Sequence, residues 1–226
     1  IDSKAAALID PPVRDRLVSY DLEAGIGGEV APSSSASPAV MWYRLGLIDA
    51  SAVPTRRGRL FSFFNHGEGL AVAAALEDES YPVTQLVRDL ANIRAGHRFD
   101  PFDKGADRLG AACRAAYGET NCDGYLEKGL PPGYGEGASE VLSLVERGPS
   151  MLASLTGDEL SSGDVERAGL EWRSLLNHIA AAPDLEWARW MELKKHAGWL
   201  VGAMPEAVRF DFPPLTNAQK TRHRSF

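Results

Sequence analysis

Three arginines in the segment RRGR, at positions 56, 57 and 59, are the side chains of this chain best suited to contact phosphate. Arginine side chains commonly bind the phosphate backbone of a nucleic acid. Trp42 and Arg44 lie a short distance upstream, in VMWYRLG, and add an aromatic ring and a further positive charge. We therefore take Trp42, Arg44, Arg56, Arg57 and Arg59 as a candidate nucleic-acid-binding set. From spacing alone an alternative fits equally well, in which Trp42 belongs to the core and the arginines form a solvated turn.

Two glycine-rich segments, NHGEGL and PGYGEGA, were the other candidates for binding phosphate. A phosphate loop of the GxxxxGK[ST] type needs its lysine to reach the outer phosphates and its hydroxyl to hold magnesium. Neither segment has these residues in place. Each also carries a glutamate between its glycines, Glu68 or Glu136, which would repel phosphate. No strand is evident ahead of PGYGEGA, so a dinucleotide-binding fingerprint is not supported either.

The remaining reactive side chains form weak patterns. The histidines do not occur in HExxH, and no cysteine lies near a histidine at the spacing of structural zinc sites. Glu192 and His196 have helical spacing, which more often gives a surface hydrogen bond than a metal site. Cys113 lies on an alanine-rich face, which favours a small buried side chain over a reactive thiolate. His66 and Glu68 flank a glycine at an irregular joint, where active sites often occur, but a third partner is missing.

The composition is that of a globular protein with an acidic balance. The 226 residues carry a formal net charge of −7, with 44% hydrophobic and 24% charged residues. This charge argues against a protein that coats nucleic acid with its whole surface, but it allows one basic face. We expect the two cysteines to be free thiols in a reducing cytoplasm. We expect no signal peptide, because the N-terminal segment IDSKAAALIDPP has no long apolar core behind a positive region. We expect no membrane partner, because no apolar run approaches the roughly 20 residues of a membrane helix. The first residue, Ile1, suggests a fragment of a longer protein.

A helix, a hairpin and a second helix are predicted to position the arginines. A short apolar helix closes on Gly46, and two extended pieces, LID and VPT, follow with DASA between them. PTRRG then opens another helix. This order is typical of the second half of a winged helix, and an ordinary helix–hairpin joint is the alternative. After FSFF, Gly67 and Gly69 each cost a helix about 1 kcal/mol relative to alanine, so we expect a break or kink there.

The rest of the chain is predicted to be mainly helical. Apolar periodicity indicates helices over residues 83–96, 106–118 and 138–148. Two longer segments, 164–182 and 184–204, each carry one apolar stripe and are joined by a short connection. They predict an antiparallel helical hairpin. The residues expected on the inner face of the second segment are Leu185, Ala188, Met191, Ala197, Leu200 and Val201.

These elements predict a mainly α fold, with a winged-helix-like unit containing one small β-hairpin followed by an α-helical bundle. We divide the chain into three regions. Residues 1–39 hold an N-terminal helix and a Ser/Pro-rich loop. Residues 40–100 hold the winged-helix-like unit and the helices that follow it. Residues 101–226 hold the bundle, with its C-terminal helical hairpin and a basic tail.

Three long segments resemble the C-terminal region of bacterial DEAD/DEAH-box helicases of superfamily 2. They are LGLIDASAVPTRRGRLFSFFNHGEGLAVAAALEDESYPVTQLVRDLANIRAGHRF (45–99), GYLEKGLPPGYGEGASEVL (124–142) and EWRSLLNHIAAAPDLEWARWMELKKHA (171–197). The resemblance covers most of residues 40–226. It implies an accessory module that follows two motor domains and borders the channel for single-stranded nucleic acid. Trp42 and Arg44 would then lie on the recognition-helix equivalent, and the three arginines of RRGR at the exit of the wing.

The resemblance also implies what this chain lacks. The ATP-binding loop, the DExH box and the arginine finger of the motor have no counterpart in the sequence. We therefore expect no catalysis and no cofactor in this fragment, with ATP and magnesium bound by the parent motor. The expected partners are single-stranded DNA or RNA and the motor domains of the same chain.

Two other functions remain open at this point. The first is a helical protein-interaction scaffold with no nucleic-acid role, in which the tryptophan-bearing hairpin at 164–203 docks a partner. The second is a small-molecule enzyme built around His66 and Glu68. The net negative charge is the main difficulty for a strand-binding surface, because such a surface needs locally concentrated cations.

Overall fold

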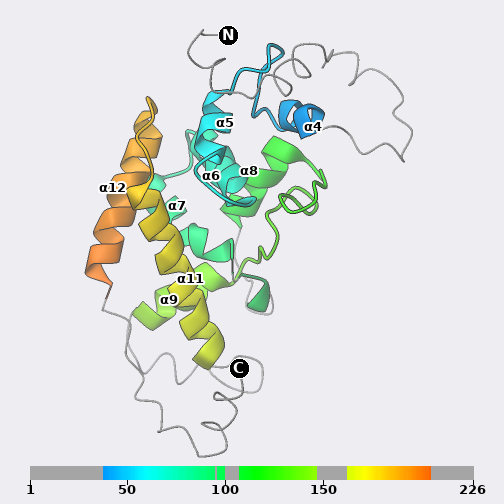
Figure 1. The fold of residues 1–226 in the computed structure, drawn as a ribbon. Coiled ribbons are helices and arrows are strands. Elements are labelled where there is room, and N and C mark those ends of the chain that lie inside the picture. The colour runs from blue at the N-terminus through cyan, green and yellow to red at the C-terminus, as the bar shows by residue number, and fades with distance from the viewer. Residues whose placement is uncertain (1–37, 95, 100–106, 147–161, 205–226) are drawn as a thin grey trace, which may run out of the picture.

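The computed structural model describes residues 38–94, 96–99, 107–146 and 162–204, and these residues are mainly helical. The predicted N-terminal helix and the predicted basic tail lie outside them. Figure 1 shows α11 and α12 side by side, with α4 and α5 at the opposite end from the start of α11. The helices in chain order are α4 (Pro38–Arg44), α5 (Arg56–Phe61), α6 (Glu68–Glu77), α7 (Val83–Asp89), η1 (Leu90–Asn92), η2 (Gly96–Arg98), α8 (Arg108–Tyr117), α9 (Ala138–Glu146), α11 (Ser162–Ala181) and α12 (Ala188–Ala203).

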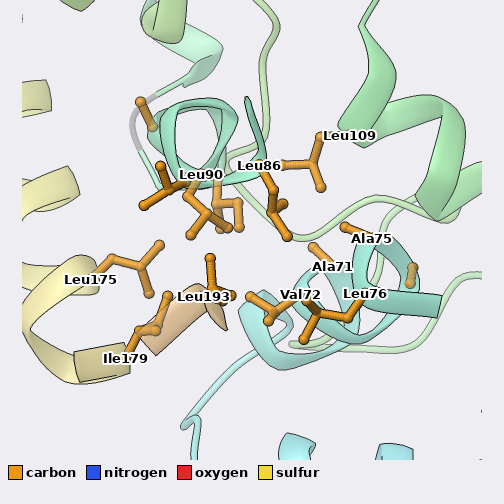
Figure 2. Packing of buried hydrophobic residues seen from close by; sticks show 14 of the residues in the cluster. Ala71, Val72, Ala75, Leu76, Leu86, Leu90, Leu109, Leu175, Ile179 and Leu193 are labelled. Atoms are coloured by element: carbon orange, nitrogen blue, oxygen red, sulfur yellow. The ribbon is translucent and has the colours of Figure 1, made fainter. Parts of the chain in front are cut away.

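Helix α6 is the centre of this fold. Every residue from Glu68 to Leu76 is buried, so the helix has no solvent-facing side until its last residue. A helix that is apolar on all sides must be enclosed by other elements, and α5 and α8 pack directly against it. Figure 2 shows side chains of α6 facing leucines of α7, α8 and α12. The small side chains of the AVAAAL run let these neighbours approach closely.

One continuous cluster of buried apolar side chains extends over both predicted units. It begins at Leu45, includes α6 and α8, and ends at Leu200 in α12. A small second cluster, formed by Ala39, Val40 and Ile48, lies beside α4. The division of the chain into three regions stays a prediction.

Helix α4 ends as the sequence predicts. Gly46 has a φ of 69°, a backbone conformation that glycine adopts without steric cost. This turn lets Leu47 N donate to Trp42 O at 2.8 Å and Gly46 N donate to Tyr43 O at 2.9 Å. The two bonds form a Schellman motif and satisfy carbonyls at the end of α4.

The predicted hairpin is reduced to a tight turn. The described part of the chain contains no strand, and the LID and VPT pieces meet in a single antiparallel bridge between Ile48 and Pro54. The pairing stops at this bridge, because Leu47 N bonds back to α4 in the turn that closes the helix and Thr55 already caps α5. The Thr55 hydroxyl oxygen accepts a hydrogen bond from Gly58 N at 3.1 Å, as expected for an N-cap.

The break expected at the NHGEG segment is confirmed, since α5 ends at Phe61 and α6 begins at Glu68. The glycines here serve close packing. A Cβ atom on Gly67 would lie 1.9 Å from the carbonyl oxygen of Tyr125, and one on Gly69 would lie 3.0 Å from Phe61 Cα. Larger residues at these positions would therefore push the 125–131 loop and α5 away from the start of α6.

The antiparallel helical hairpin is confirmed in α11 and α12. The inner face of α11 carries the predicted stripe from Val165 to Ile179. The stripe predicted for α12 is confirmed at Ala197 and Leu200 and wrong in the first turn, where Met191 is 38% exposed and its neighbour Trp190 is fully buried. The periodicity was counted from Leu185, which lies in the non-helical connection before α12 begins. The residues that α12 buries are Trp190, Leu193, Ala197 and Leu200.

Arg189 ties α12 to the end of α6. Its guanidinium donates to the carbonyl oxygens of Leu76 at 2.9 Å, Asp78 at 3.0 Å and Tyr81 at 2.6 Å. The last carbonyls of a helix have no partner within the helix and carry partial negative charge. One arginine therefore satisfies several acceptors of the turn that links α6 to α7.

Candidate nucleic-acid interface and the Glu68 cleft

The three arginines of RRGR all lie in the first turns of α5 but have different surroundings. Because helix residues three apart share a side, Arg56 and Arg59 project together and Arg57 projects elsewhere. Arg56 and Arg59 are exposed, whereas Arg57 is half-buried. The sequence set therefore contains two outward-facing arginines and one that faces the protein.

Arg57 makes its contacts within the protein. Its Nε donates to Glu77 Oε1 at 3.1 Å, Nη2 pairs with the other oxygen of Glu77, and Nη1 donates to Leu45 O at 2.8 Å. The guanidinium also lies 5.3 Å from the ring centre of Tyr117. Burial lowers the pKa of Arg57, but the hydrogen bond and the charge of Glu77 outweigh this, so the pKa lies above its ordinary value. Arg57 thus holds α4, α5 and the end of α6 together.

Arg56 and Arg59 present positive charge on the surface of α5. The Arg56 guanidinium lies 4.2 Å from the ring centre of Trp187, the residue before α12, in a cation–π contact. This contact orients Arg56 without neutralising its charge. Both side chains remain exposed and available to an anion.

Trp42 and Arg44 lie on α4, and both are exposed. Trp42 has 41% of its surface accessible, which does not fit the alternative of a core tryptophan. Two residues on a helix differ by about 200°, so Trp42 and Arg44 point to different sides. The hydrogen bond from Arg57 to Leu45 O joins the end of α4 to the first turn of α5. The backbones meet one step further along, where Thr55 N donates to Leu47 O at 2.9 Å, so the chain enters α5 close to where it leaves α4.

A second feature lies at the start of α6, where Glu68 is buried. Arg94 Nε donates to Glu68 Oε1 at 2.9 Å, across 26 residues of sequence. The other carboxylate oxygen, Oε2, is buried and has no hydrogen-bond partner. In the sequence, Glu68 lies beside His66, and nothing there indicates that Arg94 is its partner. No local signal marks Arg94 as a partner, because the pair forms only when α6 and the end of η1 pack together.

An open cleft with a volume of about 630 Å³, which we call the Glu68 cleft, is lined by both residues of this ion pair. His66 is exposed at its edge, while Pro131 is buried in its wall. The cleft combines charged groups with an apolar wall from the glycine- and proline-rich loop. Its lining residues include Asn65, His66, Glu68, Ile93, Arg94, Pro131, Pro132 and Glu171.

Two partly buried tyrosine–aspartate pairs lie around α7 and α8. Tyr81 donates through its hydroxyl to Asp89 Oδ2 at 2.5 Å, and the Tyr134 hydroxyl donates to Asp107, which also caps α8. Burial raises the pKa of Asp89 above its ordinary value, and the nearby charge of Asp107 adds to the shift. The hydroxyl of Tyr81 and the charge of Arg108 oppose this shift without cancelling it.

The remaining candidates for chemistry are inert in their surroundings. Cys113 is fully buried, and burial raises the pKa of its thiol to about 12, which confirms the expectation of a small buried side chain. Cys113 and Cys122 are both free thiols. His196 Nε2 lies 3.8 Å from Glu192 Oε1 in a surface pair. Within residues 38–94, 96–99, 107–146 and 162–204, no group of three or more His, Cys, Asp or Glu side chains could hold a metal ion.

Comparison with known proteins found no matching family and no similar curated protein or solved structure. Among the helices that the structure describes, none has both the length and the apolar character needed to cross a membrane.

Proposed function

We propose that this chain is a C-terminal accessory module of an ATP-dependent DEAD/DEAH-box helicase and contacts single-stranded nucleic acid through its α4–α5 end. The observation that carries the proposal is the group of exposed arginines, Arg44, Arg56 and Arg59, around the joint between α4 and α5. A locally basic surface on an acidic chain is what backbone binding requires, because charges act over only about 8 Å in physiological salt.

The internal role of Arg57 supports this use of its neighbours. By bonding Leu45 O and Glu77, Arg57 fixes α4 against α5 before any ligand arrives. Binding to a preformed surface loses less conformational entropy than binding to a mobile one. The exposed ring of Trp42 supplies a face on which an unpaired base can stack.

A winged-helix interpretation of this end is part of the proposal. In it α4 is the recognition helix, residues 47–55 are a short wing, and α5 is the helix that follows. The bridge between Ile48 and Pro54 and the hydrogen bond from Asp49 N to Val53 O at 2.9 Å support it. The ATP and magnesium of the parent protein would bind in the motor domains, which are also the expected docking partner of this module.

A second candidate is a protein-interaction scaffold without nucleic-acid contact. It is favoured by two exposed apolar side chains on the α11–α12 hairpin. Trp199 is 70% exposed and Leu170 is 55% exposed. Exposed tryptophan is common where proteins bind one another.

Fluorescence anisotropy with a labelled 12-nucleotide single strand tests the proposal. The test variant is Arg44→Ala/Arg59→Ala, and the matched control is Arg114→Ala/Arg167→Ala, which removes two exposed arginines from α8 and α11. Both variants lose the same net charge. We expect the test variant to bind about tenfold more weakly at low salt, and the slope of log K against log salt to become shallower by roughly 1.4. We expect the control to stay within twofold of wild type.

Two results would contradict the proposal. One is absence of strand binding at low salt. The other is an equal loss in both double variants, which would mean that only net charge matters. In either case the scaffold function becomes the better account.

A further inference from the structure

Trp187 lies at the start of α12, far along the chain from the arginines of α5, and has well-fixed surroundings. Its side chain is only 7% exposed and belongs to the main cluster of buried apolar residues. Its backbone N donates to Leu185 O at 2.7 Å, and its carbonyl oxygen accepts from Met191 N at 3.1 Å. Burial in a close-packed core and these two bonds leave the indole ring little freedom to move.

Helices α5 and α12 are both anchored to the end of α6. In α5, Arg57 Nε donates to Glu77 Oε1 at 3.1 Å. In α12, Arg189 Nε donates to Leu76 O at 2.9 Å. Leu76 and Glu77 are consecutive, so both anchors end on the last turn of α6. Packing around α6 therefore brings the ring of Trp187 to the first turn of α5.

The contact between Arg56 and Trp187 restrains a cation that stays accessible. The guanidinium carbon of Arg56 lies 4.2 Å from the centre of the indole ring, and Arg56 is exposed. Attraction to the face of a ring leaves the positive charge of the arginine in place. A guanidinium suits a phosphate group, which it can bind through two N–H groups at once. Arg57 differs, because its donors are bonded to Glu77 and Leu45 O.

A restrained arginine loses less freedom when it binds. Fixing a long side chain at an interface weakens binding by roughly twofold to tenfold. The ring of Trp187 already limits the rotamers of Arg56, so part of this loss occurs on folding and not on binding.

We propose that Trp187 is a positioning residue for strand binding, which raises the affinity by holding Arg56 in place on the surface of α5. Because Trp187 itself is buried, it acts through Arg56 and not by contact with the strand. This inference rests on the proposed function and adds to the same surface a residue from the start of α12.

A double-mutant cycle on strand affinity tests this role, with the labelled 12-nucleotide strand and fluorescence anisotropy at low salt. The variants are Trp187→Leu, Arg56→Ala and their combination. We expect Trp187→Leu to weaken binding about fivefold when Arg56 is present and by less than about 1.5-fold when it is absent. An equal loss in both backgrounds would overturn the inference, because the ring would then affect binding without Arg56.

Two further variants separate positioning from a general effect on the fold. Trp187→Phe keeps an aromatic face for the cation and should recover most of the affinity that Trp187→Leu loses. A matched cycle replaces Arg56→Ala by Arg59→Ala, which removes the same charge one turn further along α5. In that background Trp187→Leu should still weaken binding about fivefold. If its effect disappears there as well, the ring acts on the whole surface of α5 and the inference is overturned.

NMR of the arginine side chains tests the contact in the wild-type protein, so the answer does not depend on the folding of Trp187→Leu. Protons close to the face of an indole ring are shifted upfield by its ring current. We expect an upfield Nε–H signal for Arg56, assigned by its disappearance in Arg56→Lys, and we expect it to stay upfield when the strand is added. A signal at the position of free arginine, before or after the strand is added, would overturn the inference.

Failure of this inference can be told apart from failure of the proposed function. If wild type binds the strand and the losses from Trp187→Leu and Arg56→Ala are additive, Trp187 has no positioning role and the proposed function stands. If wild type binds no strand at low salt, the proposed function is overturned and the inference with it.

Discussion

Helices α5 and α6 are consecutive in the chain but use their side chains in opposite ways. Helix α6 buries every residue from Glu68 to Leu76, whereas α5 buries only Leu60 and presents Arg56 and Arg59 to solvent. The residues of α6 are mostly small and apolar, so their contribution is the packing of the surrounding helices. The exposed residues of α5 contribute little to that packing, apart from the contact of Arg56 with the ring of Trp187.

The arginines of the chain divide in a similar way into two groups, one bonded inside the protein and one exposed on its surface. Arg57, Arg94 and Arg189 bond carboxylates or helix-end carbonyls inside the protein. Arg56 and Arg59 project from the surface of α5. Substitutions in the first group should lower stability, and substitutions in the second should lower binding. Four tests of the interior of the fold follow, beginning with the largest expected effect, and two of them use exposed residues of α5 or α11 as controls.

Leu70→Ala should be the most damaging of these changes. Leu70 is fully buried in α6, and removing a buried leucine side chain costs about 3 kcal/mol of unfolding free energy, including the cavity left behind. Leu170→Ala, at an exposed site on α11, is the matched control and should change stability by less than about 0.5 kcal/mol. Urea denaturation followed by circular dichroism measures both. Similar losses in the two variants would mean that α6 is not the centre of the fold.

Arg189→Ala should have the next largest effect. The substitution removes the donors for Leu76 O, Asp78 O and Tyr81 O and should lower the unfolding free energy by about 2 kcal/mol. Arg189→Lys keeps the charge but not the planar set of donors, so it should recover only part of the loss. Arg59→Ala in the same urea experiment should leave stability unchanged. A loss from Arg59→Ala as large as that from Arg189→Ala would break the division.

The interaction between Arg57 and Glu77 should contribute less to the unfolding free energy than the contacts of Arg189. Its side chains are partly exposed, so solvent screening limits the interaction to about 1 kcal/mol. The measurement is a double-mutant cycle with Arg57→Ala, Glu77→Ala and the combined variant. A coupling energy near zero would show that Arg57 is held mainly by Leu45 O and Tyr117. Arg57 would then still act inside the protein, but not through Glu77.

Asp89→Asn should change the stability least, and unlike the other substitutions it should make the protein more stable. Because the folded-state pKa of Asp89 is raised, the unfolded state releases its proton first as the pH rises, and wild type loses stability through that window. Below the ordinary carboxyl pKa the two proteins should be nearly equally stable. Above it the variant should become the more stable, and the difference should level off once the pH exceeds the raised pKa.

Thermal melts from pH 3 to pH 8 measure this difference. The asparagine oxygen can still accept from the Tyr81 hydroxyl, so the change removes the charge and keeps the hydrogen bond. A stability difference that does not change with pH would mean that Asp89 is solvated like an ordinary surface carboxylate.

Local signals in the sequence predicted the helices and their ends well. Gly46 closes α4, Thr55 caps α5, and the glycines of NHGEG separate α5 from α6, all as expected. These signals succeed because caps and glycine turns depend on hydrogen bonds within a few residues. The apolar stripe of α11 was found for the same reason, since it lies within one regular helix.

Predictions that depended on tertiary contacts were less accurate. The stripe of α12 was misplaced at Ala188 and Met191 because the first helical residue, Ala188, could not be read from the sequence. The arginines of RRGR could not be told apart, and Arg94 was missed as the partner of Glu68. The winged helix, the helicase relationship and the strand-binding role of the exposed residues stay predictions, and the experiments above address them.

The sequence by itself determined the helical class of the protein, the ends of α4 and α5 (the helix predicted over 83–96 instead ends at Asp89 and continues as η1 to Asn92), and the candidate side chains for contact with phosphate. Only the tertiary structure decided which of those side chains are free to do so. Arg57 meets Glu77 across 20 residues and Arg94 meets Glu68 across 26, and both contacts form only after α6 is enclosed by its neighbours. Periodicity reports which side of a helix is apolar, but it does not report which distant residue will lie against that side.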